Sequence, residues 1–162
     1  MVKKTISYSS EIVVLDSMDE LTPINREAMQ KAIEMLDRAY APYSNFKVGA
    51  AAVTSTGNVY PGCNQENAAY PLCICGERVA LYNAGANEHD VPVVSLAIVC
   101  KSPEKLIEHP VSPCGACRQV ISEFEVRHSQ SIDIFLKGDT EQIYVLKGAA
   151  SLLPFLFDST YL

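Results

Sequence analysis

The sequence has no tryptophan, only three histidines and no excess of basic charge. Thirteen lysines and arginines stand against nineteen aspartates and glutamates, so the formal net charge is −6. Proteins that bind DNA or RNA rely on a basic surface that releases counterions from the phosphates. The charge balance therefore argues against a nucleic-acid partner and favours a small, neutral or modestly charged substrate.

Long hydrophobic runs are also missing. The longest, such as Val91–Cys100, is far shorter than the roughly 20 residues that a membrane-spanning helix needs. Lys3 and Lys4 are not followed by the apolar segment of a secretory signal. We therefore expect no membrane partner and a cytoplasmic location. With 162 residues, 48% of them hydrophobic, the chain is long enough for one domain with a core of its own.

The order of the predicted elements favours an α/β fold. A hydroxyl followed by proline at Thr22-Pro23 predicts a helix start, and Pro42 is expected to end that helix. Hydrophobic patterning predicts strands over 46–54, 59–64, 93–100, 131–137 and 142–146, and helices over 75–86 and 114–126. We expect a three-layer α/β/α arrangement, with a mixed sheet of about five strands and helices on both faces.

Smaller features add detail to this outline. Pro61 within the second strand of the 46–64 hairpin indicates an edge position or a bulge. Gly49 and the alanines beside it indicate that another element packs closely against the first strand. Residues 1–21 are expected to form an N-terminal arm or an edge strand, with 11–16 as a candidate strand, and 22–162 the single main domain.

Cysteine is plentiful in this chain, and three cysteines are placed for metal binding. Without an export signal, metal ligation or free thiols are expected in place of disulfides. Cys114-x-x-Cys117 begins one predicted helix and Cys75 begins another. Three thiolates leave the fourth position of a tetrahedral Zn²⁺ site open for water. Glu77, two residues after Cys75, is close enough to reach that water without ligating the metal.

Two other interpretations of the cysteines remain open. Cys114-x-x-Cys117 alone is also compatible with a redox pair. A closed structural zinc site would take Cys73 or Cys63 as a fourth ligand, but it would not account for the neighbouring Glu77. We expect Cys73 to be a bystander, and Cys63 and Cys100 to be buried as small hydrophobic residues.

The spacing C-x-E followed by P-C-x-x-C resembles the signature of zinc nucleoside and nucleobase deaminases, which general accounts of zinc deaminases use as an example. Within that group the chain resembles the small homotetrameric cytidine deaminases from about Tyr40 to Asp158. The shared motifs are Tyr40-Ala-Pro-Tyr-Ser-Asn-Phe46-x-Val-Gly-Ala-Ala, Gly62-Cys-Asn64-x-Glu66-Asn-Ala, Cys75-x-Glu77-Arg78, Pro113-Cys-Gly-Ala-Cys-Arg-Gln119 and Leu152-Leu-Pro.

The resemblance implies a role for each matching position. Zinc would be held by Cys75, Cys114 and Cys117, and Glu77 would shuttle protons. The remaining matches would bind substrate or tune the charge of the zinc site: Asn64 and Glu66 at the sugar, Phe46 against the base, Tyr70 and Phe157 completing a neighbouring subunit's pocket, and Arg78 beside the thiolates. The family usually has alanine where this chain has Gly76, whose backbone is expected to touch the base.

The function implied is hydrolytic deamination of cytidine and deoxycytidine to uridine and deoxyuridine with release of ammonia, a reaction of pyrimidine salvage. Zinc would activate the attacking water, and Glu77 would pass protons to N3 of cytosine and to the departing amine. Three alternatives are a deaminase of a related small molecule such as blasticidin S, a polynucleotide editor and a non-catalytic zinc module. Asn64-x-Glu66 favours a free nucleoside, and the acidity disfavours an editor.

Overall fold

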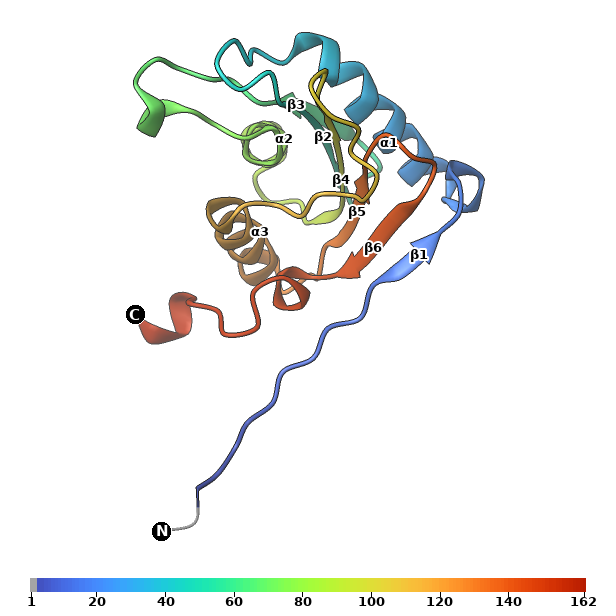
Figure 1. Cartoon of the computed structure of the whole chain (residues 1–162). Coiled ribbons are helices and arrows are strands. Elements are labelled where there is room, and N and C mark those ends of the chain that lie inside the picture. Colours follow the sequence, from blue (N-terminus) through green and yellow to red (C-terminus); the bar gives the residue numbers. More distant parts are fainter. Residues whose placement is uncertain (1–2) are drawn as a thin grey trace.

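A mixed six-stranded sheet lies at the centre of the computed structural model, which describes residues 3–162 (Figure 1). Residues 1 and 2 of the expected N-terminal arm lie outside the described residues. The strands follow the order β1-β6-β5-β4-β2-β3, and β4 and β5 are parallel while the other neighbours are antiparallel. Their bounds are β1 Val13–Leu15, β2 Lys47–Thr54, β3 Val59–Cys63, β4 Val93–Lys101, β5 Asp133–Lys137 and β6 Ile143–Lys147.

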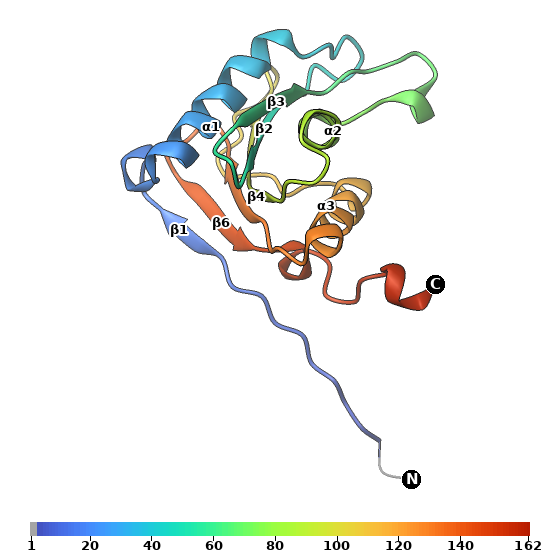
Figure 2. The same cartoon turned by 180° about the vertical axis from the view of Figure 1, so that it is seen from behind.

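Three helices cover the two faces of this sheet: α1 (Pro23–Met35) on one face, and α2 (Gly76–Asn87) with α3 (Gly115–His128) on the other (Figure 2). Successive side chains of a strand point to opposite faces. Ala50 and Ala52 accordingly join the core under α2 and α3, whereas Ala51 and Val53 join the core under α1. The predicted α/β/α layering is confirmed.

The sheet has six strands where about five were expected. The additional strand is β1, the short segment that pairs with β6 at the edge of the sheet. It lies within the segment expected as an arm or an edge strand, and residues 3–12 before it run away from the layers in extended form (Figure 2).

Helix α1 starts where the sequence predicts and ends earlier. The Thr22 hydroxyl accepts a hydrogen bond from the Asn25 amide at 3.4 Å, and Pro23 is the first helical residue. The helix does not continue to Pro42: a short 3₁₀ turn follows Met35, and Ala39 is already extended. The reason is long-range pairing, because the Tyr40 amide donates to the Asn64 carbonyl at 3.0 Å. Local helix signals carry no information about that contact.

The close packing expected at Gly49 and the edge position expected for Pro61 are both confirmed. A Cβ on Gly49 would lie 1.9 Å from the carbonyl oxygen of Ala32 in α1, so only glycine fits between the helix and β2. Pro61 lies in β3, the last strand of the sheet, where a missing amide donor leaves no partner unsatisfied. Across residues 3–162, none of the helices combines the length and the hydrophobicity needed to cross a membrane.

Candidate active site

Three cysteine sulfurs meet between the first residues of α2 and α3. The Sγ atoms of Cys75 and Cys114 are 3.7 Å apart, those of Cys114 and Cys117 are 3.5 Å apart, and all three lie within 4.8 Å of one another. A tetrahedral zinc with Zn–S bonds of about 2.3 Å places its sulfurs about 3.8 Å apart. The three thiols therefore fit a zinc ion, as the sequence predicts.

The helices themselves favour negative charge at this point. Cys75 and Cys114 occupy the capping positions of α2 and α3, each with an extended backbone, and Cys117 lies in the first turn of α3. The amino-terminal end of a helix carries unpaired amide donors and a partial positive charge. Two such ends directed at one point stabilise thiolates, the form in which cysteine binds zinc.

A hydrogen bond from the Cys117 thiol and the nearby guanidinium of Arg78 lower the pKa of Cys75 to about 5. The Arg78 Nη2 atom lies 3.9 Å from the sulfur of Cys75 and 3.3 Å from the carbonyl oxygen of Cys73. The pKa of Cys117 is raised, chiefly because its thiol donates that hydrogen bond to Cys75. Arg78 thus faces the thiolates, where the sequence places it.

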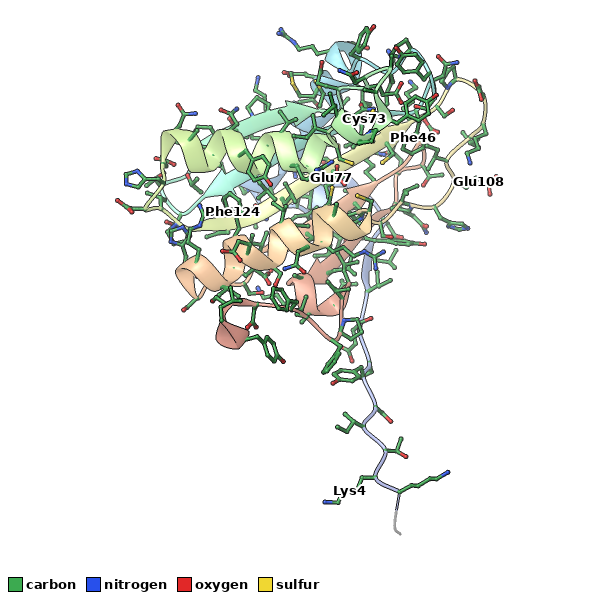
Figure 3. All side chains as sticks on the ribbon, turned by 90° about the vertical axis from the view of Figure 1, so that its left-hand side faces the viewer. Lys4, Phe46, Cys73, Glu77, Glu108 and Phe124 are labelled. Atoms are coloured by element: carbon green, nitrogen blue, oxygen red, sulfur yellow. The ribbon has the colours of Figure 1, made fainter. Side chains whose placement is uncertain are left out.

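Glu77 is buried beside the sulfurs, where α2 and α3 come together (Figure 3). Its Oε2 atom makes no hydrogen bond to any residue of the described chain. Burial raises the pKa of this carboxyl group above its usual value. A buried carboxylate oxygen without a partner is costly in a folded protein, so Oε2 is placed to interact with a substrate or a water molecule.

Glu77 opens onto a cavity of about 350 Å³. Two of the three cysteines, Cys75 and Cys114, line the same space as the predicted sugar-binding residues, and Val111 and Ser112 from the loop after β4 line it as well. Its lining includes Ser44, Phe46, Asn64, Glu66, Cys75, Glu77 and Cys114. The structure therefore brings together in one cavity residues that are up to 70 positions apart in the chain, from Ser44 to Cys114.

Asn64 and Glu66 line the cavity and are already held by neighbouring groups. The Asn64 amide donates to the Phe46 carbonyl and accepts from the Val48 amide, both at 2.9 Å. Oε2 of Glu66 accepts from the backbone amides of Tyr43 and Ser44 at 2.9 and 3.3 Å. Both side chains are therefore fixed in orientation before any ligand binds.

Comparison with known proteins agrees with this geometry. The family model for the cytidine and deoxycytidylate deaminase zinc-binding region matches residues 23–131. The chain belongs to the cytidine and deoxycytidylate deaminase family. It is 44% identical to a cytidine deaminase of Sporosarcina psychrophila over 124 residues, covering 75% of this chain and 82% of that one. It is 40% identical to a cytidine deaminase of Halalkalibacterium halodurans, covering 80% and 90% of the two chains.

Solved structures of cytidine deaminases have the same fold. The crystal structure from Burkholderia pseudomallei superposes with a TM-score of 0.72 at 40% identity, covering 85% of this chain and all of the other. The crystal structure from Mycobacterium tuberculosis superposes with a TM-score of 0.63 at 29% identity, covering 85% and 98%. The deaminase family predicted from the motifs is thus confirmed, together with a zinc-binding site of three cysteines.

Phe46 and Gly76, both predicted to contact the base, occupy different places relative to the cavity. Phe46 is half-buried and lines the cavity. Gly76 is buried against β2, so that an added Cβ would lie 2.9 Å from the Val48 carbonyl oxygen. The structure thus gives Gly76 a packing role behind the cavity wall, and contact with the base stays a prediction.

Tyr70 and Phe157, predicted to complete a neighbouring deaminase pocket, are exposed and lie outside the cavity. Tyr70 packs at an angle against Tyr43, with ring centres 5.9 Å apart, and Phe157 stacks on Tyr161 at the same distance. Their position on the surface leaves the predicted role in subunit contacts open.

The remaining cysteines behave as expected. Cys63 and Cys100 are buried, and burial raises the pKa of Cys100 to about 12. Cys73 lies apart from the three-sulfur group, with its sulfur 3.2 Å from the Asn67 amide.

Sequence reasoning missed Ser44, whose hydroxyl donates a hydrogen bond to Oε1 of Glu66. The signal was present within the quoted Tyr-Ser-Asn-Phe46 motif, but a serine in a loop has no preferred partner until the chain is folded.

Proposed function

We propose that this protein is a zinc-dependent cytidine deaminase that converts cytidine and deoxycytidine to uridine and deoxyuridine with release of ammonia. The observation that carries the proposal is the partnerless Oε2 of Glu77, buried beside three sulfurs at zinc-binding distances. A closed structural zinc site does not explain a buried carboxylate oxygen that has no hydrogen-bond partner.

Cys75, Cys114 and Cys117 would hold the zinc ion, which when bound lowers the pKa of water and so supplies a nucleophile at neutral pH. Glu77 would accept one proton of the attacking water and deliver it to N3 of the cytosine ring. It would then take the second proton of that water oxygen and pass it to the amine, which leaves as ammonia when the C4–N bond breaks. General acid–base catalysis of this kind contributes about 10²–10⁴-fold to a rate. Burial of Glu77 keeps bulk water from competing for these protons.

Other residues that line the cavity support a nucleoside substrate. Glu66 offers a carboxylate and Asn64 a primary amide, groups that accept from and donate to sugar hydroxyls. Phe46, on the cavity wall, supplies an apolar surface for the base. A cavity of about 350 Å³ suits a free nucleoside.

For assembly, we propose a homotetramer in which Tyr70 and Phe157 complete pockets of neighbouring subunits, in the cytoplasm. Exposed aromatic residues support this proposal, because Tyr70 and Phe157 are 68% and 58% exposed. Gln119 fixes the tail by donating to the Phe157 carbonyl at 2.8 Å, which presents the ring outward from a held backbone.

The direct test is the loss of cytidine and deoxycytidine absorbance on incubation with the purified, zinc-loaded protein. The proposal predicts conversion of both nucleosides with one zinc per chain. A protein that holds one zinc per chain and leaves both nucleosides unchanged would show that the nucleoside assignment is wrong.

A further inference from the structure

We propose that Ser44 is a positioning residue for the nucleoside sugar, because its hydroxyl fixes the Glu66 carboxylate in the orientation that receives a sugar hydroxyl. This inference rests on the proposed function and deepens it. Ser44 and Glu66 both line the cavity, and neither is a zinc ligand.

The contacts of Glu66 show how fully its carboxylate is held. Oε2 accepts from the Tyr43 and Ser44 amides, and Oε1 accepts from the Ser44 hydroxyl. An ionised carboxylate has about four acceptor positions. With three of them filled, one remains for a ligand, and it belongs to Oε1, the oxygen that the Ser44 hydroxyl holds.

The same hydroxyl also ties this carboxylate to the wall against which the base would pack. While it donates to Glu66, it accepts a hydrogen bond from the Phe46 amide at 3.0 Å. The Phe46 carbonyl in turn accepts from the Asn64 side chain at 2.9 Å. Glu66, Ser44, Phe46 and Asn64 thus form one continuous hydrogen-bonded chain along the cavity. Alanine at position 44 would remove both bonds of the hydroxyl.

Ser44 can be distinguished from a residue that only holds the fold together. Backbone hydrogen bonds already join the two segments: Tyr40 to Asn64 at 3.0 Å, Glu66 to Tyr40 at 2.8 Å and Asn64 to Val48 at 3.0 Å. Ser44 itself is exposed. Loss of its hydroxyl therefore leaves the backbone pairing and the two amide bonds to Oε2 in place, and releases only Oε1 of Glu66.

Electrostatics agree with this assignment. The pKa of Glu66 lies below its usual value, and the largest cause is the hydrogen bond from the Ser44 hydroxyl. The hydroxyl therefore helps to keep Glu66 ionised, which is the form that accepts a hydrogen bond from a sugar.

The test compares two substrates in Ser44→Ala and Ser44→Thr variants of the zinc-loaded protein. Cytidine carries the 2′- and 3′-hydroxyls of the sugar, and 2′,3′-dideoxycytidine lacks both while keeping the 5′-hydroxyl. For cytidine, Ser44→Ala should lower kcat/KM by about 10-fold or more, mainly through KM. The reason is that the hydrogen bond from the sugar hydroxyl to the ionised Glu66 carboxylate would be weakened. For dideoxycytidine the same variant should match wild type within about 2-fold. Ser44→Thr keeps a hydroxyl and should retain most of the cytidine activity.

The outcomes separate this inference from the proposed function. If wild type deaminates cytidine but Ser44→Ala loses activity equally on both substrates, or on neither, the positioning role is wrong and the function stands. Loss of zinc or of the folded state in Ser44→Ala would also overturn the inference, because it requires an intact scaffold. If wild type leaves cytidine unchanged, the proposed function itself fails. Ser9→Ala, an exposed serine of the N-terminal arm, is the control for purification and assay.

Discussion

Gly76 is confined more tightly than any sequence motif indicates. It is the first residue of α2, and an added Cβ would lie 2.9 Å from the Val48 carbonyl oxygen and 3.3 Å from the Cys63 Cα. The Val48 carbonyl also accepts the Asn64 amide at 3.0 Å. A side chain at position 76 would therefore push β2 toward the cavity and disturb Asn64.

We expect Gly76→Ala to destabilise the protein and to raise KM for cytidine. Replacing glycine by alanine in a helix gains up to about 1 kcal/mol, but overpacking costs about 1–3 kcal/mol, so the clash dominates. A net loss of about 1 kcal/mol lowers Tm by about 2–4 °C in a domain of this size. Thermal unfolding and steady-state kinetics measure both effects.

Gly115→Ala is the matched control for this prediction. Gly115 is the first residue of α3, and nothing lies within 4 Å of a Cβ added there. At this position no clash opposes the free energy gained from the higher helix propensity of alanine, so Tm should stay the same or rise. A Gly76→Ala variant as stable as Gly115→Ala, with an unchanged KM, would show that β2 accommodates the methyl group without strain.

Among the elements, the hairpin of β2 and β3 is fastened to the end of α2 through Glu88. Thr56 and Asn58, in the turn, donate to Oε1 of Glu88 at 2.9 and 2.8 Å. Hydrogen bonds from Thr54, and then from Asn58 and Thr56, lower the pKa of Glu88 from its reference value of 4.5. A carboxyl group whose pKa falls on folding contributes stability above its unfolded pKa, and this contribution is lost as the pH falls through the folded value.

Glu88→Gln should therefore lower Tm at pH 7 and have progressively less effect as the pH falls below 4.5, the reference pKa of the carboxyl group. The comparison is thermal unfolding of wild type and variant across that range. A Tm difference that persists unchanged in acid would mean that the charge of Glu88 plays no part in fastening the hairpin.

Local patterns predicted the elements well and their long-range partners poorly. The grouping of three cysteines could be predicted, because their identities and short spacings lie within two helix starts. The end of α1 could not, because Tyr40 leaves helical geometry to pair with Asn64, 24 positions away. Ser44 was missed for the same reason: its partner, Glu66, is 22 positions away and is set by folding. β1 was ambiguous because a three-residue edge strand has almost no pattern of its own.

For the whole molecule, the zinc site joins two helices that are otherwise separate in sequence. Cys75 belongs to the start of α2, and Cys114 and Cys117 to the start of α3. Because binding to the native state stabilises it by mass action, zinc at about 1,000 times its Kd adds about 4 kcal/mol to the free energy of unfolding. Removing zinc with a chelator should therefore lower Tm by roughly 10 °C.

Two cysteine variants make this prediction specific. Cys114→Ser should lose zinc and the chelator response, whereas Cys73→Ser should keep one zinc per chain, because Cys73 lies outside the three-sulfur group. Elemental analysis and thermal unfolding with and without chelator measure both quantities. Equal zinc loss in the two variants would place Cys73 among the ligands.

The tail provides the test of pocket sharing between subunits. Phe157→Ala should raise KM for cytidine by about 10-fold without dissociating the oligomer, because the ring would contact substrate in a neighbouring pocket; burial of a large apolar side chain contributes about 1.5–3 kcal/mol. Phe155→Ala, the adjacent exposed aromatic that packs on Tyr8, is the control. An unchanged KM for Phe157→Ala in an intact oligomer would contradict the shared pocket.

The most direct measurement for the central claim is cytidine turnover by Glu77→Gln with zinc content determined on the same sample. Glutamine keeps the size of the side chain and removes its ability to accept and return a proton. The account predicts one zinc per chain, an unchanged fold and a kcat reduced by about 10²–10⁴-fold. A variant that retains zinc and deaminates cytidine at the wild-type rate would show that Glu77 is not the proton shuttle.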